Sequence, residues 1–68
     1  MQTKLWEIRK SNKMNQSEVA DILGITVQAY RLKEQGKNQF TQDEMFSLSK
    51  YFNLDIEDIF LPRKAPKQ

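Results

Sequence analysis

Lysine and arginine gather toward the two ends of this sequence, where their charge could bind anions. Residues 1–37 hold seven of them against four Asp or Glu, residues 38–61 hold one against five, and residues 62–68 hold three against none. The net charge of +2 therefore divides into +3, −4 and +3 along the chain. Phosphate binding depends on clustered cations more than on a high total. The first half thus predicts a polyanion partner, with a solvated helical face as the alternative explanation.

Catalytic and metal chemistry has few groups to use. The sequence contains neither cysteine nor histidine, which removes disulfides, thiolate nucleophiles, the usual metal ligands and the commonest general base. We therefore expect no enzyme, no cofactor, no metal and no small-molecule substrate. The start, MQTKLWEIRK, lacks the apolar stretch of a secretory signal, and no run of about eighteen apolar residues occurs. These features predict a cytoplasmic protein with no membrane partner.

Helix boundaries can be read along the first part of the chain. Apolar spacing predicts a first helix over roughly residues 3–11. Asn15 offers an N-cap for a second helix, with Glu18 three residues on as its capping-box partner. Gly24 is expected to end that helix, because glycine adopts a positive φ without steric cost.

The same signals continue along the rest of the chain. Thr26 can cap a third helix over roughly residues 27–35, which Gly36 ends as Gly24 ends the second. Thr41 and Glu44 repeat the capping-box spacing at the start of a fourth helix. We expect the fourth helix to supply much of the core through Met45, Phe46, Leu48, Tyr51 and Phe52.

The last part of the chain predicts one more short helix and a tail. Asp55 can cap a fifth helix in DIEDIF, with its apolar residues pointing inward. No alternating pattern indicates a strand. We therefore predict an all-α fold, a compact five-helix bundle over residues 1–61, followed by a flexible basic tail at residues 62–68.

Residues 16–37 combine the features needed where two short helices cross over a tight turn. Such a crossing requires a small side chain at the contact and a flexible residue where the chain reverses, and Ala20 and Gly24 supply them. The expected apolar interior of this unit is Val19, Leu23, Ile25 and Tyr30. The whole set predicts a helix-turn-helix.

With these residues in place, the sequence resembles the Xre or Cro/C1-type helix-turn-helix regulators, which are abundant among phage repressors and Cro proteins. The resemblance covers about residues 4–60 and rests on LWEIRK, NQSEVADILGIT, KEQGK and FNLDIEDIF. It implies a lambda-repressor-like DNA-binding domain and a small regulator of a phage-type genetic switch, either Cro-like or a modulator of repression.

In such folds the third helix enters the major groove of double-stranded operator DNA, and the second helix crosses the backbone. By position, the resemblance implies base-edge contacts from Val27, Gln28, Arg31 and Leu32. Gln28 would bind an adenine edge, and Arg31 would bind guanine or phosphate. Phosphate contacts are implied for Gln16, Lys37 and Asn38. A domain this small makes few contacts, so tight DNA binding predicts a homodimer through the fifth helix and the chain end.

The resemblance also implies structural roles for charged and aromatic residues. Arg9 and Glu34 match a partly buried salt bridge between the first and third helices, and Tyr30 matches a core position. Lys33 stands where many relatives have an apolar residue. We expect its stem to pack and its ammonium to reach Glu44.

Leu32 favours a second interpretation of the same surface. Neither Val27 nor Leu32 can form a hydrogen bond with a base edge, and apolar residues beside Arg31 are typical of a protein interface. The alternative function is a modulator or antirepressor that binds a helix-turn-helix repressor protein through the surface of the second and third helices and alters its DNA binding. Trp6 either covers the edge of the core or marks a partner surface.

Overall fold

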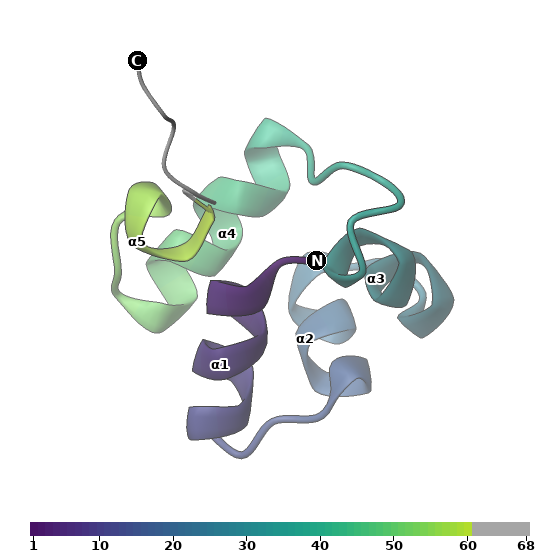
Figure 1. The fold of residues 1–68 in the computed structure, drawn as a ribbon, viewed down its shortest axis with the longest axis horizontal. Coiled ribbons are helices and arrows are strands. Elements are labelled where there is room, and N and C mark those ends of the chain that lie inside the picture. The colour runs from purple at the N-terminus through teal and green to yellow at the C-terminus, as the bar shows by residue number, and fades with distance from the viewer. Residues whose placement is uncertain (61–68) are drawn as a thin grey trace.

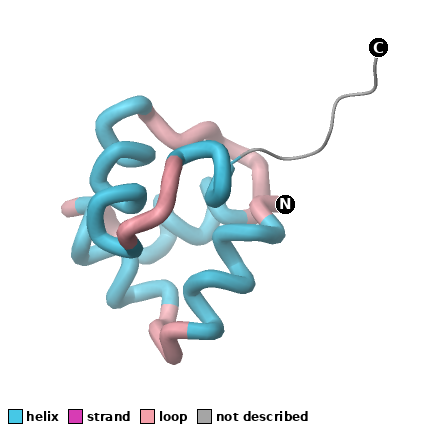
Figure 2. Tube along the Cα trace, turned by 90° about the vertical axis from the view of Figure 1, so that its left-hand side faces the viewer, coloured by secondary structure: helices cyan, strands magenta, loops and turns pink. Residues whose placement is uncertain are grey.

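The computed structural model describes residues 1–60 and shows that this part of the chain forms five helices joined by loops (Figure 1). The helices are α1 (Thr3–Ser11), α2 (Gln16–Leu23), α3 (Val27–Glu34), α4 (Gln42–Phe52) and α5 (Ile56–Phe60). No strand occurs within residues 1–60, as the colouring of Figure 2 shows, so the all-α prediction is confirmed. Leu61 and the predicted tail lie outside the described residues.

The first and last helices of residues 1–60 lie in contact with each other. α1 packs against α5, α4 also contacts α5, and α2 contacts both α3 and α4. Figure 1 shows α3 and α5 at opposite sides of the bundle. Among the helices of residues 1–60, none combines the length and apolar character needed to cross a membrane.

Local hydrogen bonds fix where three of the helices begin. Asn15 Oδ1 accepts from the Glu18 backbone N–H, and Glu18 Oε1 accepts from the Asn15 backbone N–H, each at 2.8 Å. Thr41 and Glu44 form the same reciprocal capping box at the start of α4. The Thr26 hydroxyl accepts a backbone hydrogen bond from the first turn of α3 at 3.1 Å. Three of the four predicted N-caps, Asn15, Thr26 and Thr41, are therefore confirmed.

The turn between α2 and α3 depends on the backbone of Gly24. Its φ is +73°, and a Cβ built there would meet no atom within 4 Å. The requirement is thus for the left-handed conformation and not for space. The turn lets the Ile25 backbone N–H donate to the Ala20 carbonyl at 3.1 Å, which closes the end of α2. Gly36, after α3, also has the predicted positive φ, +88°.

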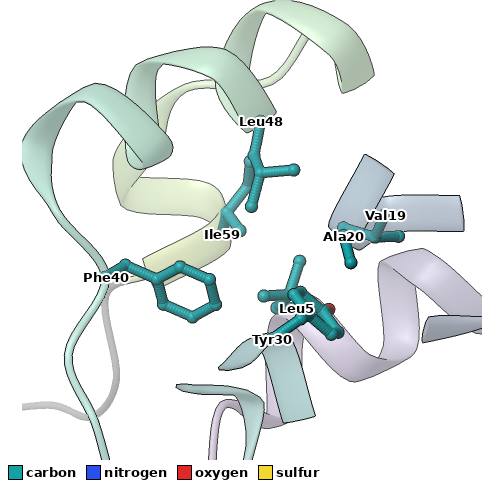
Figure 3. Packing of buried hydrophobic residues seen from close by; sticks show 7 residues of the cluster. All are labelled: Leu5, Val19, Ala20, Tyr30, Phe40, Leu48 and Ile59. Atoms are coloured by element: carbon teal, nitrogen blue, oxygen red, sulfur yellow. The ribbon is translucent and has the colours of Figure 1, made fainter. Parts of the chain in front are cut away.

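Side chains from all five helices and from the α3–α4 loop meet in one core (Figure 3). The buried apolar residues are Leu5, Val19, Ala20, Tyr30, Phe40, Leu48 and Ile59. Phe40, on the loop, lies with its ring centroid 6.1 Å from that of Tyr30 and 5.1 Å from that of Phe60. The sequence patterns did not predict the burial of Phe40, because it lies outside any periodic segment.

The contribution of α4 to the core is smaller than expected. Leu48 is its buried residue, and Met45 and Phe52 pack against the core while partly exposed. At about 100° per residue these three fall within a sector of about 60°, whereas Phe46 and Tyr51 lie about 100° or more to either side of Met45. Phe46 is 51% exposed and Tyr51 55% exposed. The expectation that these two aromatic residues fill the core is therefore wrong.

Candidate nucleic-acid interface

A buried ion pair joins α1 to the end of α3. Arg9 Nε lies 2.8 Å from Glu34 Oε2, and Arg9 Nη2 donates to Glu34 Oε1 at 3.2 Å. Arg9 Nη1 donates to the Met14 carbonyl at 2.9 Å, which also ties down the α1–α2 loop. The two charged residues are only 5% and 3% exposed. The salt bridge that the resemblance implies is thus present, and it fixes the end of α3 against α1.

Glu34 accepts two further hydrogen bonds. The Tyr30 hydroxyl donates to Oε2 at 2.8 Å, and Gln16 Nε2 donates to Oε1 at 2.9 Å. With the two bonds from Arg9, each carboxylate oxygen has two donors. A buried carboxylate needs this number of partners to offset the loss of water. The cluster of Arg9, Gln16, Tyr30 and Glu34, here called the Glu34 cluster, therefore links α1, α2 and α3.

Protonation states in the Glu34 cluster follow from burial and these bonds. Burial alone would raise the pKa of the Glu34 carboxyl, but hydrogen bonds from Arg9, Gln16 and Tyr30 outweigh it and hold this pKa below its usual value. Burial, and then the hydrogen bond to Glu34, raise the pKa of the Tyr30 phenol well above its usual value. The hydrogen bond to Glu34 raises the pKa of Arg9. At neutral pH one carboxylate faces one guanidinium and one neutral phenol.

Polar side chains expected to contact a partner gather on α3 and just beyond it. Gln28 and Arg31 are exposed on the helix, and Lys37 and Asn38 are exposed on the following loop. The backbone N–H groups of Lys37 and Asn38 both donate to the Leu32 carbonyl, at 2.9 and 3.3 Å. The loop therefore folds back on the last turn of α3 and keeps its two polar residues beside the helix.

Three apolar residues have different surroundings from these polar ones. Val27, at the start of α3, is half-buried and packs against the core, so little of its side chain faces outward. Leu32 is 39% exposed. Trp6 on α1 is also partly exposed, and Lys10 Nζ lies 5.6 Å from the centroid of its ring. Leu32 is thus the apolar residue placed on the same exposed stretch as Arg31.

Gln16 forms two side-chain hydrogen bonds that the sequence did not predict. Besides donating to Glu34, its side chain accepts from Arg31 Nε through Oε1 at 3.2 Å. The amide thus connects the buried cluster to an exposed residue of α3. The family resemblance implies a phosphate contact for Gln16 and says nothing of these two bonds. Their partners lie 15 and 18 residues away in the sequence, so no local pattern predicts them.

Lys33 forms the expected ion pair with Glu44. Its Nζ lies 2.7 Å from Glu44 Oε1 and 5.9 Å from the centroid of the Phe40 ring. Glu44 also takes part in the α4 capping box. Burial would raise the pKa of Glu44, but the hydrogen bonds from Lys33 and from the Thr41 backbone hold it below its usual value. The pair anchors the start of α4 to α3.

Comparison with known proteins points to one family. A family model described as helix-turn-helix matches residues 7–59. This range contains α2, the Gly24 turn and α3, together with the Glu34 cluster. Neither the search of curated proteins nor the search of solved structures found a match.

We expect the Arg9 and Glu34 substitutions to be strongly non-additive. Arg9→Met or Glu34→Met alone should lower the free energy of unfolding by about 3–5 kcal/mol, because each leaves a buried charge without its partner. The double variant should lose clearly less than the sum. Urea unfolding followed by circular dichroism measures this, with Lys50→Met as the exposed control within about 0.5 kcal/mol of wild type. Additive losses would contradict the account of the ion pair.

Acid should weaken the fold through Glu34 and Glu44. The folded state lowers the pKa of both carboxyls, so the unfolded chain binds their protons first as the pH falls. Their stabilisation is present above the ordinary carboxyl value of 4.5 and disappears as the pH drops through the lowered values. Urea unfolding between about pH 3 and pH 7 should show this loss, and Glu44→Gln should reduce it without abolishing it. An unfolding free energy independent of pH in this range would refute the assignment.

Proposed function

The chain belongs to the Xre/Cro-type helix-turn-helix family of DNA-binding regulators, which is not an enzyme family, and from this premise we propose that it reads double-stranded operator DNA through α3 in a phage-type genetic switch. The observation that carries the proposal is the exposure of Gln28 and Arg31 on a helix whose far side is held by the Glu34 cluster. An amide and a guanidinium are the side chains that bind adenine and guanine edges in pairs of hydrogen bonds. A firmly held helix keeps those groups in register with successive bases.

The surroundings of α3 supply the phosphate contacts in this proposal. Lys37 and Asn38 are exposed beside the last turn of α3, where a cation and an amide would meet the backbone of the same duplex. Phosphate contacts of this kind position a protein without reading sequence. Val27 would contribute at most the edge of its side chain, since it packs on the core.

Dimerisation through α5 and the chain end completes the proposed mode of binding, with residues 1–61 as the domain and residues 62–68 as a basic tail. One module of this size contacts too little DNA for a tight site, and a two-fold operator would be read by two copies. Phe60 contributes to the core through Phe40, with ring centroids 5.1 Å apart, so only its exposed portion is available for a second copy.

DNA reading predicts distinct effects for Gln28 and Lys37. A duplex selected from a random library by the full chain is the probe. Gln28→Ala should weaken binding to this duplex by about 1–3 kcal/mol and relax the preference at one base pair. Lys37→Ala should weaken binding to all duplexes alike and lower the salt slope by about one. Gln42→Ala, on the exposed start of α4, is the matched control. Failure to bind any duplex at low salt would overturn the proposal.

Leu32 supports a second candidate function, a modulator that binds a helix-turn-helix repressor. Leu32 is 39% exposed. In the sequence it lies between Arg31 and Lys33, which is ion-paired with Glu44. Apolar and arginine side chains together form the centre of many protein interfaces. A repressor domain could be bound by this surface, which would alter its DNA binding.

The modulator candidate predicts that Leu32→Glu abolishes a complex with a helix-turn-helix repressor domain. The substitution places a charge at the centre of the interface while leaving the core untouched. Leu54→Glu is the matched control, because Leu54 is 37% exposed and lies beyond α4. Isothermal titration with the purified repressor domain measures the complex. A complex that tolerates Leu32→Glu would rule out this surface.

A further inference from the structure

The side-chain amide of Gln16 lies between two groups of opposite charge. Its Nε2 donates to Glu34 Oε1 at 2.9 Å, and its Oε1 accepts from Arg31 Nε at 3.2 Å. An ionised carboxylate only accepts hydrogen bonds and a guanidinium only donates them. One orientation of the amide therefore satisfies both neighbours, with nitrogen toward Glu34 and oxygen toward Arg31. In the flipped orientation the amide oxygen would face the Glu34 carboxylate, acceptor to acceptor, and the amide nitrogen would face the Arg31 Nε–H, donor to donor.

This contact changes what Arg31 has left to offer a ligand. A guanidinium has five N–H donors, and the bond to Gln16 uses the one on Nε. The two Nη groups remain, and they form a planar fork at the exposed end of the side chain. Holding Nε fixes the plane of the fork and reduces the rotamer freedom that Arg31 would lose on binding. The restraint begins at the buried Glu34 carboxylate, which is itself held by Arg9 and Tyr30.

We propose that Gln16 is a positioning residue for Arg31, and that the two Nη groups of Arg31 bind the major-groove edge of a guanine. The inference rests on the proposed function and adds to it the residue that sets base preference. A guanine presents two acceptors, O6 and N7, in one plane, and a planar fork matches them. A phosphate can also accept this fork in a bidentate pair, but its tetrahedral oxygens accept in several planes, so fixing one plane benefits base reading more.

The test is a double-mutant cycle on base preference. The full chain selects a duplex from a random library, and each G·C pair of that duplex is replaced by A·T in turn. Wild type should prefer guanine by about tenfold or more at the pair that Arg31 reads. Gln16→Met keeps the length of the side chain but removes both hydrogen bonds, and it should lower this preference several-fold. Arg31→Met should remove the preference, because a thioether donates no hydrogen bond, and adding Gln16→Met to it should cause no further loss.

Two outcomes of the cycle would overturn the proposal. If Gln16→Met weakens all duplexes equally and leaves the preference for guanine intact, Gln16 contacts phosphate or acts only on stability. If Arg31→Met leaves the preference intact, Arg31 does not read a guanine. Gln42→Ala is the control that should change neither affinity nor preference. Circular dichroism at the temperature of the binding assay establishes that each variant is folded.

A second measurement on the free protein separates failure of the positioning from failure of DNA binding. The Nε–H of Arg31, identified in proton–nitrogen spectra by its absence in Arg31→Lys, should exchange slowly with water in wild type and several-fold faster in Gln16→Met. Equal exchange in the two proteins would overturn the positioning role even if DNA is bound. Slow exchange in a protein that binds no duplex would keep the positioning contact but overturn both the guanine assignment and the proposed function.

Discussion

The carboxylate of Glu34 is the constraint on which the rest of the structure depends. A charge that is 97% removed from solvent must be paired and hydrogen-bonded, and its four donors come from Arg9 on α1, Gln16 on α2 and Tyr30 on α3 itself. Burial of Tyr30 sets which side of α3 faces the core. The directional bonds of the Glu34 cluster add a link from that side of α3 to α1 and α2.

Small size makes this constraint more important. Within residues 1–60 the apolar core contains seven buried residues, one of them alanine, and α4 leaves Phe46 and Tyr51 outside it. A domain of this length buries a smaller share of its surface than a larger one and is correspondingly marginal in stability. Two polar links add to the apolar contacts between helices. The Glu34 cluster holds α1, α2 and α3 together, and the Lys33–Glu44 ion pair joins α3 to α4. The helix that carries the exposed Gln28, Arg31 and Leu32 is therefore held by polar contacts to α1, α2 and α4.

The sequence predicted those features whose cause lies within a few residues. Asn15 with Glu18 and Thr41 with Glu44 are three residues apart, and Gly24 needs only its own backbone, so the helix boundaries were predictable. The Arg9–Glu34 pair was reached only through family resemblance, since 25 residues separate its members. The bonds of Gln16 and the burial of Phe40 depend on how helices and loop pack in three dimensions. No periodic or capping pattern encodes either of them.

The two proposed partners of α3 compete for one surface. Arg31 and Leu32 are consecutive exposed residues of α3, and a protein interface of ordinary size, about 800 Å² on each partner, covers both side chains. A chain bound to a repressor through this stretch would therefore be unable to read a base with Arg31 at the same time. The restraint from Gln16 serves the two partners unequally. A fixed fork benefits a guanine edge, whose position is set by the stacked duplex, whereas the carboxylate of a protein partner can rotate to meet the fork in a bidentate pair. The contact between Gln16 and Arg31 thus favours DNA as the ligand for which this surface is arranged.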